Sequence, residues 1–554
     1  MKTVIIGGVA AGMSAATRLR RLDETRDITV YERGAYVSFA NCGLPYHVGG
    51  VITERSSLLL QTPESLAARF ALDVRVRHDV VAIDTAARTV TVRDIDAGTE
   101  SVETYDDLVI ATGAAAAPGP SAGAVPTHTL RSVDDVDRVL EVLADAGPQP
   151  RVVVAGAGFI GLEAVENLVA RGARATLVTR GRQVLSPLDA EMAAPLLPFL
   201  REHGVDVRLG ATIVGAEPGR VLLDDGGTVD AVLVVEASGV RPDRGLAEAA
   251  GLEVGPTGGI AVDARHRTSS PHVWAVGDGV EKRDHVGGEP ALVTMAGLAN
   301  RHGRAVADDI AGLEPSAARP ALGTAVLGLF GATVAFVGWS ERRLVADGRA
   351  HRVIHTHPAS HATYYPGAQS MAMKLLVDPA SDLILGAQIV GGDGVDKRID
   401  VIAVAMAAGL TASALSQLEL AYAPQYGSAK DPVNMIGYVA QNLAEGTTDA
   451  VQWHELPAAL GAGAALVDVR TPAEFAAGAI PGAVNLPLDE LRERHGEIPD
   501  GAVIVHCQVG QRGHTAARLL TQLGYVVRNL DGGYRTWLAG REATAPTLDE
   551  GVHA

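Results

Sequence analysis

Two isolated cysteines are the side chains in this sequence best suited to covalent redox chemistry. Cys42 lies within residues 38–43 (SFANCG), and Cys507 begins residues 507–512 (CQVGQR). The chain has 2 cysteines in 554 residues, so neither has a second protein thiol nearby in the sequence. A two-electron step at Cys42 therefore requires a small thiol, a sulfane sulfur or an oxygen species from outside. We expect Cys42 to lie near a helix N-terminus, which would lower its pKa and favour the thiolate.

Two glycine-rich turns follow apolar stretches and repeat one pattern. The first spans residues 7–12 (GGVAAG), and the second spans residues 156–161 (GAGFIG). A turn of this kind between a strand and a helix lets the backbone and the helix N-terminus approach a pyrophosphate. Glu32 ends the second strand of the first copy, where it can accept a hydrogen bond from a ribose hydroxyl. The sequence therefore predicts a duplicated nucleotide-binding fold.

The second copy differs from the first at the end of its second strand. Arg180 and Arg182 stand where an acidic residue is expected. An acid there favours NAD, whereas a nearby arginine accommodates the 2′-phosphate of NADP. This pattern favours NADPH, with the alternative that both arginines simply face water.

Alternating strands and helices must position these turns and thiols. The alternation dominates residues 1–315 and predicts α/β layers with parallel sheets. Residues 320–445 change character, residues 446–449 (GTTD) resemble a linker, and residues 450–545 form a further short α/β unit before a polar tail.

Composition bounds the function classes. The net charge of −18 argues against a nucleic-acid partner, and no apolar run reaches the roughly 20 residues that span a membrane. Two distant cysteines give no disulfide framework, so we expect a reducing, cytoplasmic compartment. No metal site is predicted.

Two further motifs indicate a flavoprotein. Residues 105–113 (YDDLVIATG) form an apolar strand that ends in a small-residue turn, and residues 268–278 (TSSPHVWAVGD) form a strand that delivers Asp278. With the glycine turns, they resemble the two-dinucleotide-binding-domain flavoprotein disulfide reductases over residues 1–440. The resemblance implies FAD and NAD(P)H as cofactors and Asp278 as a ligand of the flavin ribitol. The cofactor-binding residues that it implies are Gly7, Ala10, Ala11, Gly12, Glu32, Arg33, Val81, Ala111, Thr112, Gly113, Arg131, Gly156, Gly158, Phe159, Ile160, Gly161, Glu163, Arg180, Gly277 and Asp278.

The context of Cys42 resembles the single-cysteine branch of that family. This branch includes coenzyme A disulfide reductases, NADH oxidases and peroxidases, and persulfide or polysulfide reductases. The resemblance to the coenzyme A enzymes implies substrate-binding roles for Ser14, Arg18, Arg21, Ser38, Asn41, Arg69 and Lys430. Arg18 and Arg21 share one helix face suited to phosphates, unless they form only a solvated basic surface.

Within residues 320–445, the segments 360–367 (SHATYYPG) and 420–424 (LAYAP) resemble the dimerisation domain of the same family. There, tyrosines of the partner subunit reach the reactive sulfur, which implies a homodimer with Tyr422 and either Tyr364 or Tyr365 as catalytic residues. Tyrosines are usually amphipathic core or surface residues, so a structural role stays open.

The C-terminal unit resembles a rhodanese domain, a sulfurtransferase module. The resemblance rests on residues 465–470 (ALVDVR), 474–475, 478–485 and 531–534 (DGGY), with the Cys507 loop between a buried strand and a helix. Backbone N–H groups of such a loop stabilise a thiolate or persulfide, and the helix dipole adds to this effect. Cys507 and Arg512 are its expected catalytic residues, with a regulatory docking module as the alternative.

The predicted architecture is α/β with four parts. They are an FAD-binding domain (residues 1–115 and 247–318), an NAD(P)H-binding domain (116–246), an α+β dimerisation domain (319–445) and a rhodanese domain (450–545). The predicted function is NAD(P)H-dependent reduction of coenzyme A disulfide, coenzyme A persulfide or polysulfide through Cys42, coupled to sulfane-sulfur transfer at Cys507. The alternative is an NADH oxidase or peroxidase that uses a Cys42 sulfenate.

Overall fold

The chain folds into two compact units. The computed structural model describes residues 1–117, 119, 123–314 and 318–544, so residue 545, the last of the predicted rhodanese range, lies outside them. The first unit comprises Met1–Arg182 and Gly204–Gly323, and the second comprises Gln183–His203 and Thr324–Ala554. Within the described residues, no helix is both long and apolar enough to cross a membrane.

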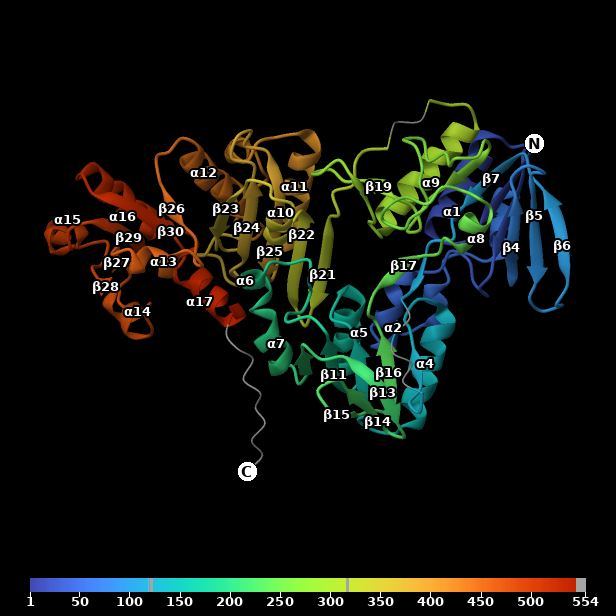
Figure 1. Cartoon of the computed structure of the whole chain (residues 1–554), viewed down its shortest axis with the longest axis horizontal. Helices are drawn as coiled ribbons and strands as arrows, with labels where there is room; N and C mark the ends of the chain where they lie inside the picture. Colours follow the sequence, from blue (N-terminus) through green and yellow to red (C-terminus); the bar gives the residue numbers. More distant parts are fainter. Residues whose placement is uncertain (118, 120–122, 315–317, 545–554) are drawn as a thin grey trace. The chain divides into compact units, whose positions relative to one another are not determined.

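The first nucleotide-binding fold is built on a parallel five-stranded sheet (Figure 1). Its central strand β1 (Lys2–Ile6) pairs in parallel with β2 (Asp27–Glu32) and β7 (Asp107–Ile110), and its apolar side chains are buried, as in sheets covered on both faces. Helix α1 (Ala10–Leu22) packs against α9 (Ala296–Ile310), so both ends of the first unit's sequence build one layer. The strands in spatial order are β18 (Val273–Ala275), β7 (Asp107–Ile110), β1 (Lys2–Ile6), β2 (Asp27–Glu32) and β3 (Asp73–Val76).

The second nucleotide-binding fold repeats this plan. Strand β10 pairs in parallel with β11 and β16, and α5 (Phe159–Ala170) follows β10 directly. Helix α4 (Val133–Asp145) begins with a capping box between Ser132 and Asp135. The strands in spatial order are β12 (Asp206–Leu209), β11 (Arg174–Thr179), β10 (Arg151–Ala155), β16 (Leu233–Glu236) and β9 (Thr127–His128). Among the described residues, four antiparallel sheets complete the unit. Two have three strands, namely β4 (His78–Asp84), β5 (Thr89–Asp94) and β6 (Glu100–Thr104), and β13 (Ile213–Glu217), β14 (Arg220–Leu223) and β15 (Thr228–Asp230). Two have two strands, namely β8 (Ala114–Ala116) with β17 (Val240–Pro242), and β19 (Lys282–Arg283) with β20 (Pro290–Ala291).

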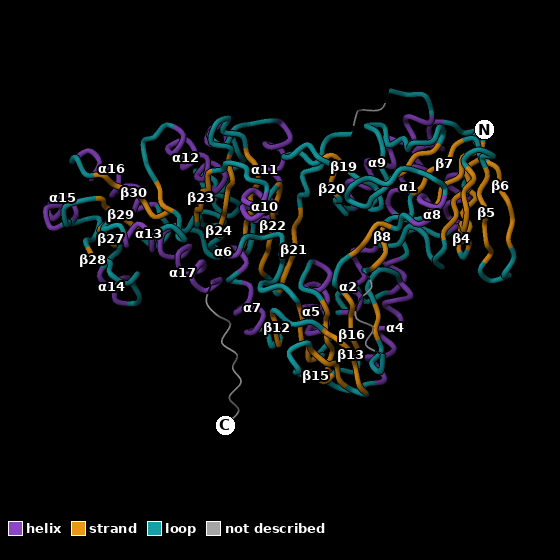
Figure 2. Tube along the Cα trace, in the orientation of Figure 1, coloured by secondary structure: helices purple, strands orange, loops and turns teal. Residues whose placement is uncertain are grey.

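The second unit contains an antiparallel sheet followed by a parallel one (Figure 2). The antiparallel sheet has the order β21 (Ala325–Leu329), β22 (Ala332–Gly338), β25 (Ile384–Gly391), β24 (Ala372–Val377) and β23 (Arg352–Thr356), with α11 (Val395–Ala408) packed on β22 and β25. Strand β23 is therefore an edge. Helices α10 (Glu341–Ala346) and α12 (Pro432–Ala444) belong to the same unit as this sheet. The segment Gln183–His203 brings α6 (Ala190–Ala193) and α7 (Leu196–Glu202) into the same unit.

The C-terminal parallel sheet has the order expected for an α/β sandwich with crossover helices. Its strands are β26 (Ala450–Val451), β30 (Val526–Leu530), β29 (Ala502–His506), β27 (Ala465–Asp468) and β28 (Val484–Asn485). Helices α13 (Leu456–Gly461), α14 (Pro472–Ala476), α15 (Leu491–Arg494) and α16 (Gln511–Gln522) connect them, and α17 (Gly533–Thr544) follows the last strand. The predicted fold class, with two Rossmann-like folds, an α+β domain and a C-terminal α/β domain, is confirmed.

Candidate active site

The first glycine turn forms a backbone cradle ahead of α1. Gly7 has φ +106°, and a Cβ at this position would overlap the carbonyl oxygen of Ala111. The Glu32 carboxylate accepts hydrogen bonds from the backbone N–H groups of Gly8 at 2.8 Å and Gly34 at 2.6 Å. The glycines keep side chains out of the turn, and the carboxylate is fixed at the strand end, so these residues fit the pyrophosphate and ribose of FAD.

The other predicted residues of this site divide between the cradle and the surface. Ala10, Ala11 and Gly12 form the first turn of α1, whereas Ala111, Thr112 and Gly113 follow β7. Arg33 is exposed and lies 3.4 Å from Asp243, and Val81 is half-buried in β4.

Asp278 follows β18 and lies among cationic groups. Burial raises the pKa of Asp278, and the charges of Lys282 and Arg131 oppose this rise. Lys282, which the sequence did not single out, donates hydrogen bonds to the carbonyl oxygens of Gly277 at 2.6 Å and Val280 at 2.8 Å. Arg131 donates to the Ala114 carbonyl oxygen at 2.7 Å. A carboxylate held in this way fits hydrogen bonding to the polyol chain of a flavin.

The second glycine turn joins β10 to α5 and is open. Gly158 caps α5, and no atom lies within 4 Å of the place where its Cβ would be. A Cβ on Gly161 would overlap the Gly156 carbonyl oxygen, so the close approach of helix and strand requires glycine. Phe159 and Ile160 begin the helix, which fits a second pyrophosphate at this turn. Arg180 and Arg182 are both exposed after β11, a placement compatible with a 2′-phosphate or with water.

Cys42 lies in the short turn η1 (Asn41–Gly43), directly before helix α2 (Leu44–Val48). Although the side chain is solvent accessible, partial burial raises the pKa of its thiol, and the carboxylates of Glu163 and Asp278 raise it further. The predicted place at a helix start is confirmed, but the predicted fall in pKa is wrong. Two carboxylates and lost hydration outweigh a helix of five residues.

Glu163 connects Cys42 with the second nucleotide-binding fold. This residue lies on α5, and burial raises the pKa of its carboxyl group, with Glu166 adding to the rise and the hydrogen bond of Tyr46 opposing it. The Tyr46 hydroxyl donates to Glu163 Oε1 at 3.3 Å, and burial raises the pKa of Tyr46 to about 12. The Cys42 thiol thus lies within electrostatic reach of both Glu163 and Asp278. Tyr46 was not among the site residues predicted from the sequence, although it follows Cys42 by four residues.

The predicted coenzyme A residues of the first unit spread over α1, α3 (Pro63–Phe70) and the Cys42 turn. Ser14 donates to Asn300 at 2.6 Å, and Arg18 forms an ion pair with Asp308 at 2.7 Å, so both side chains are already engaged with α9. Arg21, Asn41 and Arg69 are exposed. Ser38 has φ +48° and donates its N–H to the Gly8 carbonyl oxygen, which ties the Cys42 turn to the glycine turn. Lys430, in the second unit, is exposed.

Two of the three predicted tyrosines form a pair. The hydroxyl groups of Tyr364 and Tyr422 lie 2.9 Å apart. This hydrogen bond, together with slight burial, raises the pKa of Tyr422. Tyr365 instead packs edge-on against His361. Both paired side chains are exposed, and Tyr364 is therefore the partner of Tyr422 that the sequence did not distinguish from Tyr365.

Cys507 lies at the start of a loop between β29 and α16, as predicted, and is fully buried. Gly510 caps α16 with φ +90°. The backbone N–H groups of Tyr534 and Arg535 donate to the carbonyl oxygens of Cys507 at 2.8 Å and Gln508 at 3.1 Å. The first turn of α17 (Gly533–Thr544) therefore holds the backbone of the thiol loop.

Arg512 is shared between Cys507 and an acidic residue. Its guanidinium group donates to both carboxylate oxygens of Glu474, at 2.8 and 2.6 Å, and this contact, more than its interaction with Cys507, raises the pKa of Arg512. The same contact lowers the pKa of Glu474 to about 2. Arg470, paired with Asp468, donates to Gln508 Oε1 at 3.0 Å. The motif around Glu474 and Arg470 was visible in the sequence, but its link to the thiol loop was not.

Comparison with known proteins agrees with this geometry. Family models match for pyridine nucleotide-disulphide oxidoreductase (residues 1–298), its dimerisation domain (325–432) and a rhodanese-like domain (452–540). A coenzyme A disulfide reductase of Staphylococcus aureus is 34% identical over 440 residues, which are 79% of this chain and 100% of the relative.

Two solved structures are similar over almost the whole chain. The reduced CoADR-RHD of Bacillus anthracis is 43% identical, with a TM-score of 0.96 and 98% of each chain covered. An NAD-dependent persulfide reductase from A. fulgidus is 35% identical, with a TM-score of 0.89 and coverage of 97% of this chain and 100% of that one. The chain belongs to the pyridine nucleotide-disulphide oxidoreductases, as a flavin-dependent enzyme of the coenzyme A disulfide reductase type that carries a rhodanese domain.

Proposed function

We propose that this chain reduces coenzyme A disulfide, coenzyme A persulfide or polysulfide at Cys42 with electrons from NAD(P)H, and that Cys507 carries sulfane sulfur. The observation that carries the proposal is the presence of two single-thiol sites of different construction in one chain. Cys42 is accessible beside two cofactor folds, whereas Cys507 is buried in a loop with an arginine beside it. The similarity to a coenzyme A disulfide reductase and to a persulfide reductase supports the same acceptors.

At Cys42 the proposed chemistry is thiol exchange followed by reduction. The thiolate attacks coenzyme A disulfide and releases one coenzyme A thiolate, or it attacks coenzyme A persulfide and releases hydrosulfide. Either attack leaves a mixed disulfide between Cys42 and coenzyme A. FAD, which the glycine turn, Glu32 and Asp278 would hold, would supply two electrons from NAD(P)H. With one proton, these would convert the disulfide into the Cys42 thiolate and free coenzyme A.

The groups around Cys42 suit proton handling in this cycle. Burial raises the pKa of Glu163, whose carboxyl group lies within electrostatic reach of the sulfur, and Tyr46 is hydrogen bonded to it, so two groups that can exchange protons lie near the reacting thiol. We propose that Tyr364 and Tyr422 of a partner subunit donate to the leaving sulfur in a homodimer. Ser14, Arg18, Arg21, Ser38, Asn41, Arg69 and Lys430 are proposed to bind coenzyme A.

At Cys507 the proposed chemistry is sulfur transfer without net electron flow. The Cys507 thiolate takes a sulfane sulfur from a persulfide donor, which leaves as a thiolate, and the new persulfide passes that sulfur to coenzyme A. This step forms the coenzyme A persulfide that Cys42 consumes. Arg512 is proposed to stabilise the anionic sulfur from the mouth of the loop.

The test is acceptor-dependent NAD(P)H oxidation by the full chain and its Cys42→Ser variant. We expect the variant to retain FAD, seen in its visible spectrum, and to lose at least about 10³-fold in turnover with coenzyme A disulfide and polysulfide. Cys507→Ala is the matched control, because it should retain reduction of coenzyme A disulfide. Equal turnover of Cys42→Ser and wild type would refute the proposal, and turnover with oxygen alone as fast as with the sulfur acceptors would favour an oxidase.

A further inference from the structure

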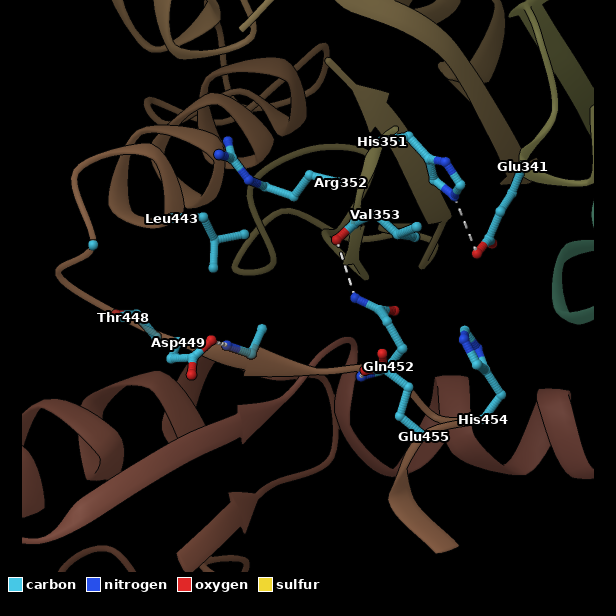
Figure 3. A pocket seen from close by; sticks show the side chains of 12 residues that line it. Glu341, His351, Arg352, Val353, Leu443, Thr448, Asp449, Gln452, His454 and Glu455 are labelled. Carbon is cyan, nitrogen blue, oxygen red and sulfur yellow. Dashed lines mark hydrogen bonds and ion pairs between the residues drawn. The ribbon is translucent and has the colours of Figure 1, made fainter. Parts of the chain in front are cut away.

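The rhodanese domain covers the open edge of the dimerisation sheet. Among the strands of the described residues, β23 pairs with β24 alone, so its other edge carries backbone groups without a strand partner. Two of these groups, on alternate residues, contact the rhodanese domain. The Gln452 amide donates to the Val353 carbonyl oxygen at 3.1 Å, and the His355 N–H donates to the Asp531 carboxylate at 2.9 Å. Figure 3 shows the first contact at the border of a cavity of about 430 Å³.

His355 is the buried centre of the second contact. Its side chain is 2% exposed, and its two ring nitrogens contact carboxylates on opposite sides. Nδ1 lies 2.7 Å from Asp531 of the rhodanese domain, and Nε2 lies 3.2 Å from Glu191 of α6. An imidazole can donate from both nitrogens at once only when it is protonated. Both contacts therefore require a positively charged ring.

Asp531 begins a turn that reaches Cys507. Gly532 and Gly533 follow it, both with φ +65°, a conformation that favours glycine. A Cβ on Gly532 would lie 2.8 Å from the His355 Cβ, and a Cβ on Gly533 would lie 2.8 Å from the backbone N of Gly510. One face of the turn therefore touches His355, and the other face touches the thiol loop.

We propose that His355 is a positioning residue for sulfur transfer at Cys507. Its charged ring fixes Asp531, and the glycine turn transmits this constraint to the backbone behind the buried thiol. The inference rests on the proposed sulfur-carrying role of Cys507 and adds that the dimerisation domain is part of the sulfurtransferase site.

The charge of the ring makes this constraint depend on pH. Although burial opposes the charged form, the hydrogen bonds to Asp531 and Glu191 raise the pKa of His355 to about 9. Lys374 and His357 also face the ring, and burial lowers the pKa of His357 to about 3, so His357 is neutral. Because the folded-state pKa lies above the ordinary value near 6.5, the constraint is complete below about pH 6.5 and is lost as the pH rises through about 9.

The test compares His355→Asn with wild type in the full chain. Asparagine retains a neutral donor near the Nδ1 position but cannot be charged. Thiosulfate supplies sulfane sulfur and leaves as sulfite, and cyanide accepts the sulfur as thiocyanate. At pH 7.5 we expect a fivefold to tenfold loss of kcat, since charge-assisted hydrogen bonds are about twice as strong as neutral ones. The wild-type to variant ratio should approach one above about pH 10, because wild-type His355 is then neutral as well.

A second measurement does not depend on turnover. Iodoacetamide labelling of Cys507, followed by mass spectrometry, should be about fivefold faster in His355→Asn and Asp531→Asn at pH 7.5, and this difference should also vanish above about pH 10. Cys42 in the same sample is an internal control with unchanged labelling. His351→Asn, four residues away and facing the cavity in Figure 3, is the matched control with wild-type rates.

The outcomes separate the two hypotheses. Equal labelling in wild type and both variants, or a ratio that is constant across pH, overturns the positioning role. A wild-type protein that transfers no sulfur refutes the sulfur-carrying function, while the labelling still decides whether His355 constrains the loop.

Discussion

Replacing Lys374 by methionine is expected to destabilise the second unit strongly. The Lys374 side chain is 0% exposed, and its ammonium group lies 2.5 Å from Glu191, 2.6 Å from Glu341 and 2.9 Å from Asp189. Although burial opposes the charge, these three carboxylates raise the pKa of Lys374. The ammonium ion thus fills a cluster of three acidic groups that would otherwise resemble a metal site.

The size of the destabilisation depends on which hydrogen-bond partners each carboxylate keeps after the substitution. Asp189 keeps the Gln388 amide at 2.6 Å and two backbone N–H donors at 2.9 and 3.1 Å, and the Glu341 side chain is 19% exposed to water. Glu191 is 5% exposed, and within the described part of the chain His355, at 3.2 Å, is the partner that it keeps. The buried Glu191 carboxylate therefore loses most of the positive charge that balances it, which lowers the free energy of unfolding by about 3–5 kcal/mol. At roughly 2–4 °C per kcal/mol for a unit of this size, the Tm should fall by about 6–20 °C.

Thermal unfolding followed by tryptophan fluorescence measures this effect. Three of the four tryptophans, Trp339, Trp453 and Trp537, lie in the second unit, and flavin fluorescence reports on the first. Adding Glu191→Gln to Lys374→Met should recover most of the loss, whereas adding Asp189→Asn should recover little. A loss below about 1 kcal/mol, or equal recovery by the two second substitutions, would refute this assignment of the buried charges.

Two further substitutions probe the nucleotide and sulfur sites. Arg180→Glu should raise the KM for NADPH by about tenfold to a hundredfold through loss of a charge-assisted phosphate contact, with little change for NADH, and steady-state kinetics with both nucleotides would measure this. An unchanged KM for NADPH would mean that Arg180 faces only water. Glu474→Gln should change the free energy of unfolding by less than about 1 kcal/mol, because the pair with Arg512 is partly exposed. The substitution also frees the Arg512 guanidinium group, and we expect it to lower the KM for thiosulfate about twofold to fivefold. The same KM in Glu474→Gln and wild type would argue against a role of Arg512 in donor binding.

Features encoded in short segments were predictable from the sequence. The two glycine turns, Glu32 and the Cys507 loop each need only a strand, a turn and a helix in succession, so their residue types and spacing predict the local geometry. The tyrosine motifs were also visible, but the pairing of Tyr364 with Tyr422 depends on how two loops meet.

Features that depend on packing between distant segments could not be predicted. Nothing in the residues around Glu191 indicates that they leave the nucleotide-binding sequence to join the second unit beside Lys374. The prediction that the pKa of Cys42 falls was wrong for the same reason. Glu163 is 121 positions away in the sequence (163 − 42), and only the fold brings it close to the thiol. Local motifs do not encode the electrostatic effects of residues that are distant in the sequence.

The covered border of β23 has a consequence for shorter versions of this enzyme. In a protein truncated at residue 446, the Val353 carbonyl oxygen and the His355 N–H would be exposed to water. They could then form hydrogen bonds with a strand of another molecule. Such a truncated subunit should self-associate through that border unless a charged or proline residue is introduced there. We therefore expect the fused rhodanese domain also to limit self-association of the subunit.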